Sequence, residues 1–279
     1  MSVCKTCKTA KILKNGKLDD VIVSTNHKPL DPNEQWFPIE KIPNPDKTDF
    51  NPRGFNRKLE IKLGKSMAGR RIFYYGANAR KFDNKLVKTT QRRAYGDWKN
   101  HGLSTVDLNG NVEISFICPQ NYSTSTDSYI SHIHFMKTTK GGKWENKLFT
   151  IGVICSVSNE ELRFCMEKKC AVILNALSIN EYIRARIPES HSLPVDKLLE
   201  KNTPQEIVKY IEVLCSKYPL IHRALSTEKI QLFDVPLILY CYSEKCNASD
   251  KLANKLWQLG FRNIKEYTPG ITGYLSLTQ

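Results

Sequence analysis

Two apolar runs in the second half of the chain restrict its fold more than any other feature. The runs AVILNAL (171–177) and VPLILYC (235–241) have the length of strands and lack the polar alternation of a half-exposed strand. Such runs are typical of strands buried on both faces of a parallel sheet. Three helix starts accompany them, each a Ser or Thr followed by Glu three residues later: Ser158/Glu161, Ser178/Glu181 and Thr203/Glu206. We therefore predict an α/β domain with a parallel sheet over residues 158–279.

Residues 59–157 predict β-structure of another kind. Asn109-Gly110 separates two alternating runs within residues 103–118, and Gly141-Gly142 separates two further strand-like segments. Both patterns favour hairpins, so we expect a basic, β-rich sandwich or barrel here. Residues 1–58 are rich in Pro, Asn and Asp and are expected to form an extended arm or loops. The fold class expected for the whole chain is α+β with two domains.

The positive charge of the chain is concentrated in its first half. Residues 1–157 contain 26 Lys and Arg against 14 Asp and Glu, which accounts for +12 of the net charge of +14. A basic surface favours a polyanionic partner, because binding releases condensed counterions. An excess of lysines that only increases solubility explains the same numbers, so residues 1–157 have two open interpretations.

The cysteines and the hydropathy of the chain suggest a compartment. Nine cysteines are an odd number with irregular spacing, and no apolar run is long enough for a signal peptide or a membrane span. We therefore expect a soluble, cytoplasmic protein with reduced thiols and no membrane partner. Cys4 and Cys7 form a single C-x-x-C pair, to which we assign no function.

Cys241 ends the second apolar run, and a helix is expected to begin near residues 247–249. Ligands of open α/β sheets bind beyond the carboxyl ends of the strands, and the amides of a helix N-terminus stabilise an anion. A thiol at this position is predicted to have a lowered pKa and to act as a nucleophile. The alternative is an inert thiol in the core, since cysteine is among the most buried residue types.

Residues 158–274 resemble the rhodanese family of sulfurtransferases. The matching pieces occur in the family's order: SNEELRFCM, INEYIRARIPESHSLPV, VPLILYCYSEKCNAS and LANKLWQLGFRNIKEYTPGITGY. Some positions depart from the family pattern. Cys246 stands where the family often has Arg, and the final segment has Tyr274 in place of Trp. Without that Arg, thiosulfate is expected to be a poor donor.

The resemblance implies a function for one cysteine and its loop. Cys241 matches the cysteine that accepts sulfane sulfur as a persulfide, and the following loop matches the one that surrounds it: Tyr242, Ser243, Glu244, Lys245 and Cys246. The implied partners are a sulfane-sulfur donor and a thiol acceptor, and no metal or organic cofactor is implied. Cys246 is either a second thiol that resolves an oxidised or persulfidated Cys241 as a disulfide, or a small residue that packs under the loop.

His132 and His134 are two residues apart on a predicted strand, so their side chains lie on one face. Two imidazoles can bind Zn, Cu or Fe if further ligands are near. Cys118 and Asp127 are candidates for such ligands. The alternative is a pair of histidines on a solvated strand face.

Two hypotheses for the whole protein follow. In the first, it is a rhodanese-like sulfurtransferase that carries sulfur on Cys241. In the second, the rhodanese-like domain is catalytically silent, and residues 1–157 attach the protein to a polyanion or a larger assembly such as a virus particle. The protein would then be virion-associated rather than free in the cytoplasm.

Overall fold

A computed structural model describes residues 16–17, 37–80, 82, 86–123, 127–196 and 203–277. The described residues divide into two compact units. Unit 1 contains residues up to 80 together with 89–153, and unit 2 contains 81–88 together with 154–279. Cys4 and Cys7 lie outside the described residues. No helix in the described ranges is both long and apolar enough to cross a membrane.

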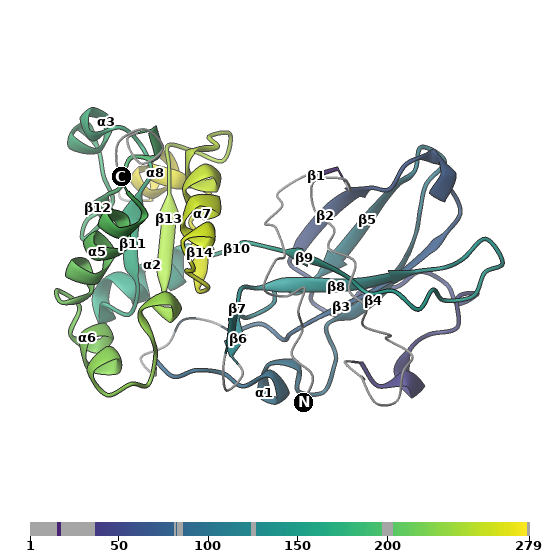
Figure 1. The fold of residues 1–279 in the computed structure, drawn as a ribbon. Helices are drawn as coiled ribbons and strands as arrows, with labels where there is room; N and C mark the ends of the chain where they lie inside the picture. The colour runs from purple at the N-terminus through teal and green to yellow at the C-terminus, as the bar shows by residue number, and fades with distance from the viewer. Residues whose placement is uncertain are drawn as a thin grey trace. The chain divides into compact units, whose positions relative to one another are not determined.

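Unit 1 is built mainly from three sheets (Figure 1). The largest has four antiparallel strands in the order β4 (His101–Thr105), β3 (Arg71–Gly76), β8 (His132–Lys137) and β9 (Phe149–Gly152). The second has the order β1 (Gly16–Lys17), β2 (Arg57–Lys62) and β5 (Asn111–Phe116), and the third pairs β6 (Tyr122–Ser123) with β7 (Ser128–Tyr129). Short helical elements are η2 (Ile39–Lys41), η3 (Lys65–Met67) and α1 (Gln91–Tyr95).

Of the two predicted hairpins, one forms and one does not. β8 and β9, on either side of Gly141-Gly142, pair antiparallel as expected. The turn at Asn109-Gly110 also forms, with Gly110 at φ 83°, but β4 and β5 belong to different sheets. A shared apolar core explains this difference, because Leu59 and Val112 of one sheet cluster with Ile72 and Ile133 of the other. No sheet among the described strands closes on itself, so the barrel alternative is wrong, and the sandwich alternative stays a prediction.

Unit 2 contains the predicted parallel sheet, with helices on both sides of it (Figure 1). Its strand order is β10 (Cys155–Ser156), β14 (Ile264–Glu266), β13 (Leu237–Tyr240), β11 (Val172–Asn175) and β12 (His191–Ser192), and every pair is parallel. β11 and β13 are buried throughout, as their lack of polar alternation predicts. The mixed class with a parallel sheet is thus confirmed.

The predicted helix starts of unit 2 coincide with observed N-caps. The side chains of Ser158, Ser178 and Thr203 each accept a hydrogen bond from the amide three residues later, and the last two form complete capping boxes. The helices of unit 2 are α2 (Asn159–Lys168), α3 (Ile179–Arg184), α5 (Pro204–Cys215), α6 (Pro219–Ser226), α7 (Ala248–Gln258) and α8 (Gly270–Ser276), with the short η4 (Leu232–Asp234).

The cysteines differ from the expectation in one respect. Cys118 and Cys155 are disulfide-bonded, so the prediction of reduced thiols is wrong for these two residues. Five others are free: Cys165, Cys170, Cys215, Cys241 and Cys246. The irregular spacing of cysteines along a chain does not reveal which of them the fold brings together.

Candidate functional site

Cys241 occupies the position that the sequence predicts. β13 ends at Tyr240 and α7 begins at Ala248, so the thiol directly follows a central strand and a short loop precedes the helix. Cys241 is 3% exposed, whereas the neighbouring Tyr242 is 56% exposed. The cysteine is therefore at the floor of the loop, and the loop itself faces solvent.

The sulfur of Cys241 is surrounded by polar groups. The hydroxyl of Ser249 lies 3.1 Å from Sγ, and the carbonyl oxygens of Ser243 and Cys246 lie 3.7 and 3.5 Å away. The thiol of Cys246 and the backbone amide of Ser249 also lie close enough to affect its pKa. Carbonyl oxygens accept a proton from a thiol and repel a thiolate, so this geometry holds the protonated form.

The predicted lowering of the Cys241 pKa is wrong. Burial and, next, the hydrogen bond with the Cys246 thiol raise the pKa of Cys241 above its ordinary value, and the hydroxyl and amide of Ser249 only partly oppose them. The prediction placed the loop amides around the sulfur, but the structure places two carbonyl oxygens there. Among the described residues, the backbone amide that stabilises the thiolate belongs to Ser249, in the first turn of α7.

Ser249 connects Cys241 to a buried carboxyl group. Its hydroxyl is 2.5 Å from Oε1 of Glu266, and Ser249 and Glu266 are 1% and 3% exposed. One hydroxyl proton serves only one of the two acceptors at a time. The Ser249 hydroxyl therefore links Sγ of Cys241 and Oε1 of Glu266 through two alternative hydrogen bonds.

Ser249 and Glu266 lie in no sequence pattern that marks them as site residues. Glu266 ends β14, and its neighbour across the sheet is Leu239 of β13, two residues before Cys241. Carboxyl ends of adjacent parallel strands meet at one edge of a sheet. Glu266 lies in the mixed segment NIKEY (263–267), which carries no distinct signal for a site residue, and the pairing of β14 with β13 had first to be known.

The carbonyl groups of Cys241 and Tyr242 are held by the start of α8. The amide of Ile271 donates to the carbonyl of Cys241 at 3.0 Å, and the amide of Thr272 donates to that of Tyr242 at 3.1 Å. Gly270 permits this approach, because a Cβ at this position would lie 2.6 Å from the carbonyl oxygens of both residues. Its φ of 63° also favours glycine.

The rest of the loop is largely exposed. Tyr242, Glu244 and Lys245 are exposed, whereas Ser243 and Cys246 are half-buried. The amide of Cys246 donates to the carbonyl of Ser243 at 3.0 Å, which closes a tight turn. Cys246 carries a free thiol beside that of Cys241. The loop therefore has two thiols within reach of each other, one at its floor and one nearer to solvent.

His132 and His134 do not lie on a solvated face, so that alternative is wrong. They are 1% and 0% exposed, and their ring centroids are 4.8 Å apart. Nδ1 of His132 is 2.6 Å from the carbonyl of Ile130, and Nδ1 of His134 is 2.9 Å from the hydroxyl of Thr150. Burial lowers the pKa of His132 to about 4.

The suggested further metal ligands do not join this pair. Cys118 is disulfide-bonded and therefore offers no thiolate. In the ranges that the structure covers, no group of three His, Cys, Asp or Glu side chains could hold a metal ion. Asp127 therefore does not form such a group with His132 and His134. Within the described ranges, the two imidazoles have no third ligand of these four residue types.

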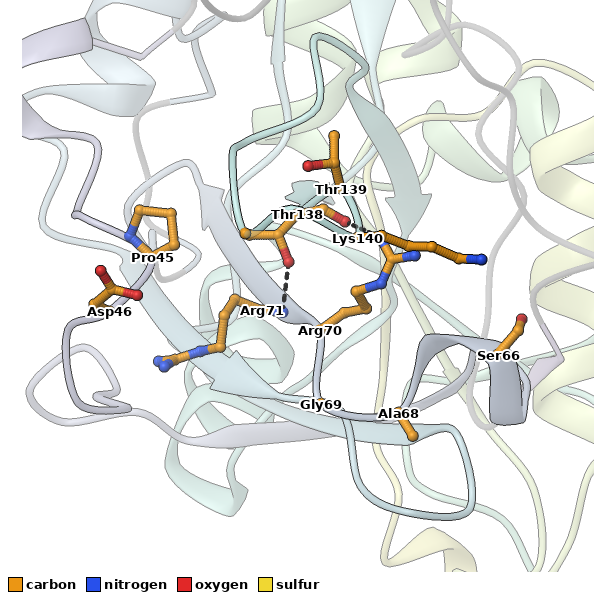
Figure 2. Close-up of a pocket in the computed structure, with 11 residues that line it drawn as sticks. Pro45, Asp46, Ser66, Ala68, Gly69, Arg70, Arg71, Thr138, Thr139 and Lys140 are labelled. Atoms are coloured by element: carbon orange, nitrogen blue, oxygen red, sulfur yellow. Dashed lines mark hydrogen bonds between the residues drawn. The ribbon is translucent and has the colours of Figure 1, made fainter.

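Unit 1 also contains a pocket of about 670 Å³ with three cationic side chains (Figure 2). Nη1 of Arg70 donates to the carbonyl of Thr138 at 2.6 Å, and the amide of Arg71 donates to the hydroxyl of Thr138 at 3.0 Å. Lys140 is exposed and makes no ion pair within the described part of the chain. The complete lining is Pro45, Asp46, Ser66, Ala68, Gly69, Arg70, Arg71, Thr138, Thr139, Lys140 and Gly142.

Several solved structures are similar to part of this chain. A human single-domain sulfurtransferase is 22% identical over 43% of this chain and 95% of its own, with a TM-score of 0.30. A rhodanese-related protein of Thermoplasma volcanium is 20% identical over 44% and 92%, with a TM-score of 0.30. A single-domain sulfurtransferase of Saccharomyces cerevisiae is 16% identical over 44% and 90%, with a TM-score of 0.32. No family model and no curated protein matches the chain.

Proposed function

We propose that unit 2 is a rhodanese-like sulfurtransferase that carries sulfane sulfur as a persulfide on Cys241. The observation that supports this most is the placement of Cys241. Its free thiol lies at the carboxyl end of a central parallel strand, beside a second free thiol on Cys246. It is also joined through Ser249 to a buried carboxyl group that can accept its proton. A nucleophile with an adjacent base is the usual arrangement for covalent transfer.

The proposed reaction needs only thiols and a sulfane donor. The Cys241 proton passes through Ser249 to Glu266, and the thiolate attacks the outer sulfur of a donor persulfide. A sulfur–sulfur bond forms on Cys241 as the donor's bond breaks, and the donor leaves as a thiolate. An acceptor thiolate then takes the outer sulfur by the same displacement. If Cys246 instead attacks the inner sulfur of Cys241, the products are a Cys241–Cys246 disulfide and hydrosulfide.

Intact-protein and peptide mass spectrometry test this function. After incubation with a low-molecular-weight persulfide, we expect the peptide with Cys241 to gain one sulfur atom. Cys241→Ala should abolish the gain. Cys215→Ala is the matched control, since it removes a free buried thiol of the same unit. No added sulfur on wild-type Cys241, or equal labelling of the Cys241→Ala variant, contradicts the proposal.

The cationic pocket of unit 1 favours a second function, binding of a polyanion. Arg70, Arg71 and Lys140 meet there with the hydroxyls of Ser66 and Thr139, a combination that suits phosphate or sulfate groups. Two of these cations already have protein partners. Arg71 pairs with Asp49 at 2.6 Å, and Arg70 is bound to a carbonyl. Lys140 would therefore be the main contact to the anion.

Heparin and duplex DNA are suitable probes for this second function. We expect Lys140→Ala to weaken binding to both and to lower the slope of log affinity against log salt by roughly 1. Lys168→Ala is the control, because it removes a surface lysine of unit 2. Equal effects of both substitutions would indicate nonspecific charge, and no binding by the wild type would refute the proposal.

A further inference from the structure

The cationic pocket of unit 1 also contains an acidic side chain. Asp46 lines it together with Arg70, Arg71 and Lys140. Asp46 is exposed, and its carboxylate makes no hydrogen bond or ion pair within the described part of the chain. Figure 2 shows Asp46 and Arg71 on one side of the pocket and Lys140 and Ser66 on the other. The carboxylate is therefore available to a ligand rather than used to neutralise a neighbouring arginine.

The two arginines of the pocket keep hydrogen-bond donors for an anion. A guanidinium group has five N–H donors. The hydrogen bond of Arg70 to the carbonyl of Thr138 uses Nη1, and that of Arg71 to Asp49 uses Nη2. Lys140 adds an exposed ammonium group. The pocket thus combines several donors for sulfate or phosphate oxygens with one carboxylate that needs donors from its ligand.

The carboxylate of Asp46 restricts which polyanions fit. A carboxylate can only accept hydrogen bonds, so a ligand beside Asp46 must bring hydroxyl or N–H donors as well as anionic groups. The backbone of duplex DNA brings phosphates without hydroxyl donors, and a phosphate next to Asp46 is repelled. A sugar ring that carries sulfate or phosphate groups brings both the anionic groups and free hydroxyls. The charges and acceptors of the pocket therefore favour a saccharide over duplex DNA.

The lining of the pocket also disfavours single-stranded RNA. The 2′-hydroxyl of RNA is a donor, but bases of single-stranded RNA commonly stack on aromatic side chains. The described residues that line the pocket include no aromatic side chain, whereas Ser66 and Thr139 provide hydroxyls. The volume of about 670 Å³ lies in the range of small-molecule sites. These features suit polar sugar rings better than nucleobases.

We propose that this pocket binds an anionic saccharide, whose sugar rings carry sulfate or phosphate groups. The inference rests on the polyanion binding proposed for unit 1 and narrows it to one class of ligand. Arg70, Arg71 and Lys140 bind the anionic groups, and Asp46 accepts hydrogen bonds from ring hydroxyls. Asp46 also selects against duplex DNA, because a like charge without a donor opposes binding.

Calorimetric titration of the full chain with a heparin hexasaccharide and with duplex DNA of equal charge tests this selectivity. We expect Asp46→Ala to weaken binding of the hexasaccharide by roughly 10-fold, because hydrogen bonds to a charged group are lost. Binding of duplex DNA should stay unchanged or become tighter, because a negative charge is removed. Glu60→Ala is the matched control, since it removes an exposed carboxylate of unit 1 that does not line the pocket. It should affect both ligands alike.

Modified ligands test the same point without any substitution in the protein. Fully O-sulfated heparin has more charge than heparin and no free hydroxyls. We expect it to bind the wild type less tightly than ordinary heparin of the same length, whereas charge alone predicts tighter binding. A phosphomannan oligosaccharide of that length provides the phosphorylated ligand, and the tighter of the two saccharides identifies sulfate or phosphate as the preferred group.

Three results would overturn the proposal and leave polyanion binding intact. These are equal or tighter binding of the hexasaccharide by Asp46→Ala, tighter binding of fully O-sulfated heparin, and tighter binding of duplex DNA or single-stranded RNA than of a saccharide of equal charge. If the wild type binds neither heparin nor DNA, the polyanion function itself is refuted, and the saccharide proposal with it.

Discussion

Replacing Ser249 by Ala should make Cys241 a weaker acid and a slower nucleophile. The Ser249 hydroxyl is 3.1 Å from Sγ and is the side chain that lowers the thiol pKa. A hydrogen bond to a charged group contributes about 1.5–3 kcal/mol, and one pKa unit corresponds to about 1.4 kcal/mol. The Cys241 pKa should therefore rise by roughly 1–2 units. Because burial already raises this pKa, the thiolate fraction at neutral pH should fall by about 10–100-fold.

The rate of iodoacetamide alkylation of the Cys241 peptide, followed by mass spectrometry across pH, measures this change directly. The midpoint of the rate profile gives the thiol pKa, and its plateau gives the reactivity of the thiolate. We expect Ser249→Ala to move the midpoint upward and leave the plateau nearly constant. Glu266→Gln should slow persulfide formation, since an amide cannot accept the thiol proton. Ser276→Ala is the control, because that serine is exposed on α8.

Two results would refute this reasoning. An unchanged or lower midpoint in Ser249→Ala would mean that the hydroxyl does not stabilise the thiolate. Equal rates of persulfide formation in the wild type and Glu266→Gln would mean that Glu266 does not receive the proton. In the second case the sulfur-carrying role of Cys241 could still hold, so the two conclusions are separable.

Three further outcomes are expected. Gly270→Ala should destabilise unit 2 by about 1–3 kcal/mol in urea unfolding. The added Cβ would meet the carbonyl oxygens of Cys241 and Tyr242, and the φ of residue 270 is positive. Unchanged stability would contradict the close packing of α8. The protein should lose stability as pH falls from 6.5 towards 4, since the pKa of His132 is about 4 in the folded protein against 6.5 when exposed. The loss should reach about 3 kcal/mol, and a His132→Gln variant should lose less. Cys246→Ser should accumulate the Cys241 persulfide if Cys246 is the resolving thiol; an equal yield would assign it a packing role.

The helix starts and buried strands of unit 2 were predictable because the residues within each short segment determine them. The N-caps at Ser178 and Thr203 depend on residues within one helical turn. The buried strands β11 and β13 follow from apolar runs that only a covered sheet can accommodate. From these features the sequence also predicted that Cys241 lies between a strand end and a helix start.

The strand pairing of unit 1 was less predictable. A turn at Asn109-Gly110 specifies a change of direction, but β4 and β5 continue into different sheets. Apolar residues of both sheets share one core, and burying that shared surface outweighs pairing the two consecutive strands. Turn residues report local backbone angles and carry no information about which strands are neighbours in the fold.

The amino-acid order by itself determined the parallel α/β domain, the helix starts and the position of Cys241, because each can be predicted from the pattern of residues within a short segment. The tertiary structure alone decided the environment of the sulfur. It brought Ser249 and Glu266 to Cys241, turned two carbonyl groups towards Sγ, and gathered Tyr95 and Tyr122 around His132. The two carbonyl contacts lie within the loop after Cys241. The other contacts join separate elements of the chain, and their distances follow from how strands and helices pack.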